Sequence, residues 1–335
     1  MRILIVTDAW FPQINGVVRT LDTVRGELNA LGHRVEVISP KDFRTIPCPT
    51  YPEIRLALWP GHRIARVIAR FEPQAIHIAT EGPLGWAARR LCLKSKLPFT
   101  TSFHTKFPEY IHARFRIPVS WGYAVLRRFH EPSRGVMVAT PTLARALEAN
   151  GFKTVKPWSR GVNTGLFHPR ERGFLEGPRP ISLFVGRVAV EKNVEAFLKL
   201  DLKGTKYVVG DGPQMAELKA RYPQVRFTGY KTGEDLAQHV ADADVFVFPS
   251  RTDTYGLVLL EALASGVPVA AYPVHGPIDV VNGHRIGVLD EDLGCAVRKA
   301  LKISRTACRD FALGFTWRAC AEEFLGNLHP FELSD

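Results

Sequence analysis

The sequence predicts an α/β protein built from two Rossmann-like, doubly wound domains. The chain has 335 residues, 46% of them hydrophobic and 23% charged, which suffices for two compact cores of roughly 150 residues each. Short apolar segments alternate with helical patterns in two successive series, and a polar stretch rich in glycine and proline, residues 163–180, separates the series. We therefore expect domains over residues 1–165 and 166–316, and a helix within residues 317–335 that packs back toward the first domain.

The first series opens with a strand, a helix and a second strand. Residues 3–7 are predicted to form a buried strand, and residues 34–38 the next strand. Between them, apolar residues recur at helical spacing until Gly32, namely Val17, Val18, Leu21, Val24, Leu28 and Leu31. Parallel strands joined in this way need a crossover that places the helix on one face of the sheet. Apolar runs at residues 75–78, 99–103 and 135–139 continue the same sheet.

The second series predicts a second parallel sheet. Strands are expected at residues 181–185, 207–209, 225–228, 245–248 and 267–271, with amphipathic helices between them. Open sheets of this type bind ligands beyond the carboxyl ends of their strands. Two such domains therefore predict a central cleft in which both sheets present their carboxyl ends and hold two substrates together.

The cysteines and the N-terminus indicate the cellular compartment. The five cysteines are scattered and form no C-x-x-C pair, which argues against a disulfide framework and against a zinc site. The apolar run at the N-terminus meets Asp8 too early for a signal sequence or a membrane span. We expect a cytoplasmic protein.

The excess of positive charge lies in the first half of the chain. Residues 1–165 contain 24 lysines and arginines against 11 acidic residues, a net charge of +13, whereas residues 166–335 carry a net charge of −2. A basic surface of this kind suits an anionic lipid, a polyanionic substrate or a nucleic acid, or it serves only solubility.

A polar segment after the predicted strand at residues 245–248 is a candidate ligand site. The chain lacks both G-x-G-x-x-G and G-x-x-x-x-G-K-[ST], so hydride transfer and nucleotide hydrolysis lose their main sequence support. A helix is expected over residues 255–264, and its first turn would offer an anion free N–H groups, with Gly256 permitting close approach. Asp253 and Glu261 could hydrogen-bond two hydroxyl-bearing parts of one ligand; alternatively, Asp253 caps the helix and Glu261 is structural.

Residues 250–261 resemble the E-x7-E signature of the retaining glycosyltransferases of family 4, which have the GT-B fold. Residues 184–193 resemble the G-R-x-x-x-E-K-N segment of that family, and the resemblance implies that Arg187 and Lys192 bind the diphosphate of a nucleotide-sugar donor. A guanidinium and an ammonium about one turn apart suit two phosphates. Residues 12–17 match the N-terminal glycine loop, and residues 210–213 and 227–230 match the turns beneath the nucleoside. The resemblance implies these donor-binding residues: Gly16, Arg187, Lys192, Gly229, Tyr230, Asp253, Thr254, Tyr255, Gly256, Leu257 and Glu261.

His104, in residues 102–110, resembles the family histidine that faces the reacting sugar. The resemblance implies transfer with retention by front-face attack, in which the departing diphosphate helps to deprotonate the acceptor. His104 would then orient the sugar and would not be a general base, while Arg187 and Lys192 would stabilise the leaving group. The catalytic set implied in this way is His104, Arg187, Lys192 and Asp253.

The chain departs from the family pattern at two acids. The first acid of the signature is Asp253 where the family usually has Glu, and Asn163 stands where the family usually has an acid. Asp242 and Asp244 form a D-x-D sequence, but a strand continues directly from it and family members seldom need a metal. We expect neither a metal nor another cofactor.

Two basic amphipathic stretches bear on the acceptor. Arg63, Arg66 and Arg70 recur at helical spacing, and an apolar segment containing Trp121 and Val125 precedes Arg127 and Arg128. Each suits an anionic membrane surface, and each is equally consistent with a plain helix that has a solvated arginine face. Together with the one-sided charge they predict a lipid-linked or glycan acceptor and a peripheral position on the inner face of the cell membrane.

Several functions remain open from the sequence. GDP-mannose is the first expected donor and a UDP-hexose, used by a glycolipid synthase of the same family, is the second. An epimerase acting on the same donor shares the GT-B fold, and a basic nucleic-acid-binding protein is the alternative of another class. The last is disfavoured because the chain has no recognised nucleic-acid-binding motif and no interleaved aromatic residues for base stacking.

Overall fold

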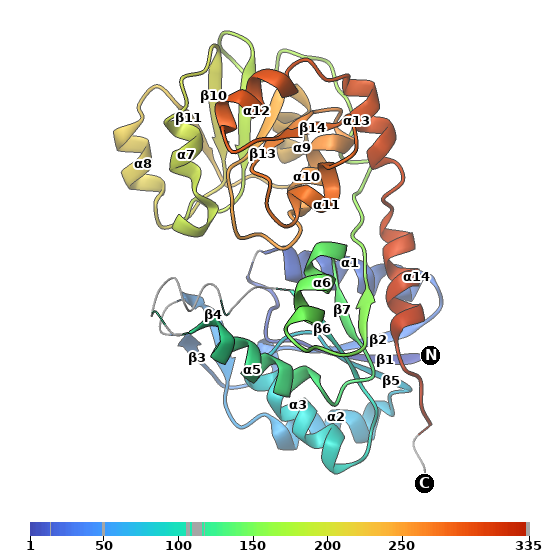
Figure 1. Ribbon diagram of the computed structural model, residues 1–335. Coiled ribbons are helices and arrows are strands. Elements are labelled where there is room, and N and C mark those ends of the chain that lie inside the picture. The colour runs from blue at the N-terminus through green and yellow to red at the C-terminus, as the bar shows by residue number, and fades with distance from the viewer. Residues whose placement is uncertain (14, 49–50, 105–107, 109–115, 117, 333–335) are drawn as a thin grey trace. The chain divides into compact units, whose positions relative to one another are not determined.

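The computed structural model divides the chain into two compact units (Figure 1). It describes all residues except 14, 49–50, 105–107, 109–115, 117 and 333–335, and the side chains of residues 51–53. Unit 1 comprises Met1–Arg160 and Trp317–Asp335, and unit 2 comprises Gly161–Thr316. The division falls at Arg160, a few residues before the boundary expected from the sequence.

Unit 1 is organised around a six-stranded parallel sheet in the order β2-β1-β5-β6-β7-β8. Its strands are β1 (Arg2–Val6), β2 (Arg34–Ile38), β5 (Ala75–Ile78), β6 (Thr100–Phe103), β7 (Val136–Val138) and β8 (Val155–Pro157). The chain runs from β1 to β2 at one edge and then crosses back to β5 on the other side of β1. The strand order therefore reverses between β1 and β5, where a doubly wound sheet binds ligands.

Helices cover both faces of this sheet: α1 (Gly16–Ala30), α2 (Gly61–Phe71), α3 (Pro83–Lys94), α5 (Val119–His130), α6 (Pro141–Ala149) and α14 (Trp317–Asn327). Ile3 and Ile5 of β1 belong to the core beneath α1 and α14, whereas Leu4 and Val6 belong to the core beneath α2 and α3. Burial on both faces explains the continuous apolar sequence of the strand. A hairpin of β3 (Thr45–Cys48) and β4 (Tyr51–Ala57), which the sequence analysis did not predict, stands apart from the sheet.

The last helix, α14, packs against α1 in unit 1 (Figure 1). The indole of Trp158 is fully buried, and its ring centroid lies 4.9 Å from that of Phe324. The Glu323 carboxylate accepts hydrogen bonds from the backbone N–H of Ser159 at 2.5 Å and from its hydroxyl at 2.6 Å. These contacts fix the chain immediately before it leaves unit 1.

Unit 2 repeats the doubly wound architecture with the strand order β11-β10-β9-β12-β13-β14. Its strands are β9 (Ile181–Val185), β10 (Thr205–Val209), β11 (Arg226–Gly229), β12 (Val245–Phe248), β13 (Val269–Ala271) and β14 (Gly287–Leu289). Its helices are α7 (Val194–Leu198), α8 (Met215–Arg221), α9 (Gly233–Asp242), α10 (Leu257–Ala264), α11 (Pro277–Val281), α12 (Leu293–Ala300) and α13 (Arg305–Ala312). The order reverses between β9 and β12. The predicted α/β class with two doubly wound sheets is confirmed.

The D-x-D sequence has a structural role in unit 2. Asp242 accepts hydrogen bonds from the backbone N–H groups of Gly173 and Leu175, at 3.1 and 2.6 Å, and pairs with Arg179. Asp244 pairs with Arg179 at 2.8 Å and with Arg172 at 3.0 Å. Both carboxylates thus hold the segment that leads into β9. Among the described residues, no group of three or more His, Cys, Asp or Glu side chains could hold a metal ion.

Asp8 closes the point of strand reversal in unit 1. It follows β1, and its carboxylate accepts hydrogen bonds from the N–H groups of Leu84 at 2.8 Å and Gly85 at 3.3 Å, in the first turn of α3. The Thr80 hydroxyl donates a third, at 2.9 Å. Burial raises the pKa of Asp8 to about 6, although these hydrogen bonds act in the opposite direction. A side chain on Gly85 would place its Cβ 1.9 Å from the Thr80 carbonyl oxygen, so α3 can approach this closely only with glycine there.

We predict opposite effects for the same substitution at two helical glycines. Gly85→Ala should destabilise the protein by about 1–3 kcal/mol, because its Cβ overlaps a backbone oxygen. Gly26→Ala in α1 should stabilise it by about 0.5–1 kcal/mol, because no atom lies within 4 Å of the added Cβ and alanine favours a helix. Urea unfolding followed by circular dichroism measures both. Equal losses at the two sites would contradict this packing of α3.

The raised pKa of Asp8 predicts a pH dependence of stability. Between pH 6 and pH 3.8 the folded state binds a proton at Asp8 that the unfolded state releases, so this residue's contribution improves as the pH falls through that window. Relative to Asp8→Asn, the wild type should gain roughly 1–3 kcal/mol of unfolding free energy between pH 7 and pH 4. Parallel denaturation curves at the two pH values measure this difference, and a constant gap between the proteins would show that Asp8 does not titrate there.

Candidate active site

Most of the predicted donor-binding residues of unit 2 follow the two strands at its point of strand reversal, whereas Gly229 and Tyr230 lie at the end of the edge strand β11. β9 ends at Val185, just before Gly186 and Arg187, and β12 ends at Phe248, just before the segment that contains Asp253. β9 and β12 pair with each other at Ser182 and Val245 and at Leu183 and Phe246. The two strands thus separate from each other toward their carboxyl ends, where a doubly wound sheet binds its ligand.

Glycines allow the loops at this edge to pack backbone against backbone. The Gly186 N–H donates to the Val209 carbonyl at 3.0 Å, and the Gly210 N–H donates to the Gly229 carbonyl at 2.8 Å. A Cβ on Gly210 would lie 1.8 Å from the Gly186 oxygen, and Gly229 has a φ of 76°. Tyr230 follows Gly229 with its side chain half-exposed. The close packing of the loops at the sheet edge that contains Gly229 and Tyr230 therefore requires glycine at residues 210 and 229.

Hydrogen bonds tie the loop after β9 to the loop after β12. The Asn193 amide donates to the Pro249 carbonyl at 3.1 Å, from a backbone in the left-handed region with a φ of 51°. The Glu191 carbonyl accepts from the hydroxyls of Ser250 at 3.3 Å and Thr252 at 3.2 Å. Asn193, Ser250 and Thr252 lie in segments that the sequence analysis singled out, but it gave them no role of their own, because their contacts join segments that are far apart in the sequence.

Lys192 and Asp253 form an ion pair within this site. The Lys192 ammonium lies 2.5 Å from Asp253 Oδ1, and the two side chains are 24% and 16% exposed. Asp253 Oδ2 is buried, and no described residue donates a hydrogen bond to it. The Arg187 side chain, in contrast, is exposed. Arg187, Lys192 and Asp253 thus bring two cations and one carboxylate to the loops after β9 and β12.

Helix α10 begins at Leu257 and not at residue 255 as the sequence predicted. Gly256 has a φ of 82°, outside the helical region, and therefore precedes the helix. Its Cβ would lie 3.0 Å from the Phe248 ring, so the position requires glycine. No side chain caps this helix start among the described residues, so Asp253 is not the cap that the alternative interpretation proposed. Glu261, in the second turn, is only 4% exposed.

The loop before α11 packs closely against the backbone of the signature segment. Tyr255 is buried and Thr254 is half-buried. Gly276 precedes α11 with a φ of 85°, and its Cβ would lie 2.9 Å from the Tyr255 carbonyl and 3.2 Å from the Asp253 carbonyl. The sequence analysis missed Gly276, although the glycine and proline at residues 276–277 signal a turn.

His104 lies in unit 1, at the carboxyl end of β6. Its Nε2 is 2.8 Å from the Ser102 hydroxyl, and its Nδ1 is 3.4 Å from the Arg160 guanidinium. Burial, followed by the charge of Arg160, lowers the pKa of His104 well below its ordinary value. A guanidinium can only donate, so Nδ1 is the acceptor and Nε2 carries the proton that is donated to Ser102. The imidazole is neutral and a weak base.

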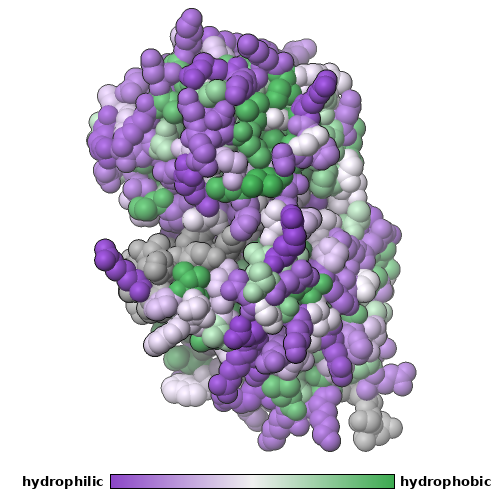
Figure 2. Space-filling model, viewed as in Figure 1, coloured by the Kyte–Doolittle hydropathy of each residue, from purple (hydrophilic) through white to green (hydrophobic). Residues whose placement is uncertain are grey.

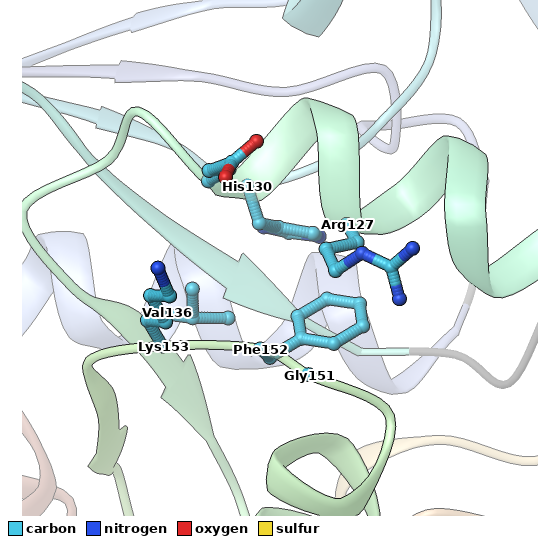
Figure 3. Close-up of a pocket in the computed structure, with 7 residues that line it drawn as sticks. Arg127, His130, Val136, Gly151, Phe152 and Lys153 are labelled. Atoms are coloured by element: carbon cyan, nitrogen blue, oxygen red, sulfur yellow. The ribbon is translucent and has the colours of Figure 1, made fainter.

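A buried polar network lies behind His104. His77 contacts Ser102 at 3.1 Å and Thr100 at 3.0 Å, and burial lowers its pKa to about 3. His130 contacts the Glu81 carboxylate at 3.2 Å. The other side of His130 borders a hollow lined by Arg127, Glu131, Val136, Gly151, Phe152 and Lys153, which has room for little more than a water molecule (Figure 3). That hollow is too small for a sugar.

Gly16 is the first residue of α1 in unit 1 and is exposed. The Asn15 side chain accepts hydrogen bonds from the N–H groups of Val17 and Val18, both at 3.0 Å. This cap satisfies two of the free donors of the helix start. Gly16 and His104 therefore belong to unit 1, and the other predicted site residues belong to unit 2. Residues 105–107 and 109–110 of the segment around His104 lie outside the described residues.

Comparisons with known proteins agree with this architecture. The family model described as Glycosyltransferase Family 4 matches residues 14–166, and that described as Glycosyl transferases group 1 matches residues 179–302. A GDP-mannose-dependent alpha-mannosyltransferase of Mycobacterium tuberculosis is 30% identical over 98% of this chain and 96% of its own length. An alpha-monoglucosyldiacylglycerol synthase of Streptococcus pneumoniae is 27% identical over 99% of this chain and 86% of its own.

Solved structures share the fold. Sucrose-phosphate synthase from Thermosynechococcus elongatus superposes with a TM-score of 0.78 at 20% identity, covering 97% of both chains. The Anabaena protein HepE in complex with UDP-glucose superposes with a TM-score of 0.71 at 14% identity, covering 97% of this chain and 98% of its own. With two doubly wound sheets and relatives along nearly its whole length, the chain has the GT-B fold and belongs to glycosyltransferase family 4.

Proposed function

We propose that this glycosyltransferase moves mannose from GDP-mannose to a lipid-linked or glycan acceptor with retention of configuration. The observation that carries the proposal is the grouping, at the strand reversal of unit 2, of Lys192, Asp253 and the start of α10, which no side chain of the described residues caps. Relatives of M. tuberculosis and Mycolicibacterium smegmatis, 30% and 31% identical along nearly the whole chain, are named GDP-mannose-dependent alpha-mannosyltransferases. Their names support the choice of donor.

In this proposal, different residues of unit 2 bind different parts of the donor. Arg187 and Lys192 bind the diphosphate, together with the N–H groups at the start of α10 after Gly256. Asp253 accepts a hydrogen bond from a sugar hydroxyl through Oδ2, and Glu261 binds the ribose. The turn at Gly229 and Tyr230 receives the base. The remaining donor contacts come from Thr254, Tyr255 and Leu257 of unit 2 and from Gly16 of unit 1.

The proposed chemistry needs charge stabilisation more than a strong base. The departing diphosphate gains negative charge as the glycosidic bond breaks, and Arg187 and Lys192 stabilise that charge. The lowered pKa of His104 suits a residue that orients the sugar as a neutral hydrogen-bonding group. The proposal includes no metal, and the ion pairs of Asp242 and Asp244 with arginines support leaving the D-x-D sequence out of catalysis.

A UDP-hexose is the second candidate donor. The glycolipid synthase of S. pneumoniae and a sulfoquinovosyl transferase of Arabidopsis thaliana, 30% identical over 83% of this chain and 60% of its own length, support a glycolipid product. An epimerase acting on the same donor would instead yield an altered sugar nucleotide when no acceptor is present.

The basic helices of unit 1 support a contact with an anionic membrane. The sequence suggested that the apolar and the basic residues of both helices take part, but the structure leaves the two helices with different exposed residues. Ile64, Ile68 and Phe71 of α2 are buried in the core, so this helix offers a membrane only its arginine face. On α5, Trp121 is 70% exposed and Val125 is 56% exposed. Figure 2 shows a mainly hydrophilic surface with smaller hydrophobic areas on the visible face. No helix of the described residues is long and apolar enough to cross a bilayer.

We predict that the donor stabilises the folded protein. A thermal-shift panel of GDP, UDP, ADP and their sugars should give the largest increase with GDP-mannose, because a ligand that binds only the folded state raises the melting temperature. Product analysis with donor alone then distinguishes transfer from epimerisation. A larger shift with a UDP-hexose would assign the second donor, and no shift with any sugar nucleotide would contradict the donor site.

Two substitutions should remove catalysis without unfolding the protein. His104→Ala and Lys192→Ala should each lower turnover at least about a hundredfold, because each removes a group that acts on the reacting sugar or the leaving group. His329→Ala and Lys199→Ala, at exposed positions outside the site, are the matched controls. Steady-state turnover and the melting temperature are measured for all four. Near-normal turnover in either site variant would refute its assigned role.

Membrane binding should depend on both the aromatic and the cationic side chains. Flotation with anionic liposomes should weaken about fivefold for Arg66→Gln, since each arginine near such a surface contributes about 1 kcal/mol. Trp121→Ser should also weaken it, whereas Leu313→Ser, an exposed apolar position in unit 2, should not. Equal flotation with neutral liposomes would argue against this surface.

A further inference from the structure

Lys192 and Asp253 form an ion pair, although in the proposed function they bind different parts of the donor. Lys192 is assigned to the diphosphate and Asp253 to the sugar. The inference below rests on that proposed function. In the structure, the ammonium that would bind phosphate is already hydrogen-bonded by the carboxylate that would bind the sugar, at 2.5 Å.

The surrounding loops hold this pair in place. Asn193, next to Lys192, donates to the backbone after β12, and the backbone of Glu191 accepts from the hydroxyls of Ser250 and Thr252. Both charged side chains are largely shielded from water, with exposures of 24% and 16%. The attraction is therefore screened less than in a surface ion pair. The lysine cannot turn to a diphosphate without weakening a shielded contact.

A nucleoside diphosphate lacking its sugar would meet this carboxylate unfavourably. Its phosphates would compete with Asp253 for the same ammonium, and two anions would lie close together with little solvent between them. Asp253 would then keep a buried carboxylate with fewer donors, which is costly. A sugar hydroxyl offsets the loss, because it can donate to Oδ2, the buried oxygen to which no described residue donates.

We propose that Asp253 is a specificity-determining residue that uses its ion pair with Lys192 to select sugar-bearing nucleotides against the bare nucleoside diphosphate. The carboxylate weakens binding of the diphosphate because it competes for the Lys192 ammonium. It strengthens binding of the sugar because Oδ2 accepts a hydrogen bond from a sugar hydroxyl. The same contact makes the nucleoside diphosphate, the product of transfer, bind more weakly than the donor. Discrimination between donor and product is thereby built into one side chain.

The test compares the affinities of a nucleoside diphosphate and its sugar. Isothermal titration calorimetry without acceptor gives Kd for GDP and GDP-mannose, and for UDP and UDP-glucose, with the wild-type chain. For Asp253→Asn we expect GDP to bind about tenfold more tightly and GDP-mannose to bind more weakly. The Kd of GDP divided by the Kd of GDP-mannose should therefore fall by a factor of about ten or more, which corresponds to about 1.4 kcal/mol. Asp253→Glu, which keeps the charge, should retain more than half of this discrimination on a logarithmic scale.

Matched variants separate the ion pair from a general effect of charge. Glu291→Gln removes an acid from another ion pair of the same unit, with Arg251 at 3.0 Å, and should leave the ratio unchanged. In a Lys192→Met background, Asp253→Asn should change the GDP affinity less than about threefold, because the carboxylate no longer competes for an ammonium. Melting temperatures confirm that each variant is folded.

Three results would overturn the inference while leaving the donor site intact. They are an unchanged ratio in Asp253→Asn, the same gain in GDP affinity with or without Lys192, and an equal shift in Glu291→Gln. If the folded wild-type chain bound neither sugar nucleotide, the proposed function itself would fail, and the inference with it. The two failures are therefore distinguishable before any variant is compared.

Discussion

Reversal of strand order within each parallel sheet is the constraint on which the rest of this structure depends. Because the crossovers are right-handed, the helices of crossovers that run in opposite directions along the sheet lie on opposite faces, and the two strands at the reversal end beside each other with polar backbone groups exposed. In unit 1 this happens between β1 and β5, and in unit 2 between β9 and β12. Asp8, Arg187, Lys192 and Asp253 lie on the segments that follow these strand ends, whereas His104 follows β6 and Gly229 ends β11.

The two reversals differ in the charge that fills them. In unit 1 the carboxylate of Asp8 accepts from the first N–H groups of α3, so a protein anion already occupies the helix start. In unit 2 the corresponding helix, α10, begins after Gly256 without a side-chain cap among the described residues, and Lys192 and Arg187 lie on the loop after β9. An anionic ligand is thus favoured at unit 2 and disfavoured at the helix start of unit 1. This difference supports the assignment of the diphosphate to unit 2.

Burial also sets the chemistry of the histidines in unit 1. His77 and His104 lie in a polar network where desolvation favours the neutral imidazole, and the charge of Arg160 acts in the same direction on His104. Neutral rings joined through Ser102 can hold a fixed orientation but accept protons poorly. A site of this kind suits a reaction in which the leaving group, and not the enzyme, takes the proton.

The sequence by itself determined the fold class, most of the strands and the family. Continuous apolar runs such as Ile3–Val6 are visible without a structure, because strands covered on both faces need apolar residues at every position. Only the tertiary structure decided the β3–β4 hairpin, the start of α10 at Leu257, and the burial of the apolar face of α2. It also decided the pairing of Lys192 with Asp253 and of Ser102 and Arg160 with His104. Lys192 pairs with Asp253, and Arg160 with His104, across more than fifty positions of sequence. The spacing of residue types along a chain does not indicate such contacts, because they form only when the sheets bring the two segments together.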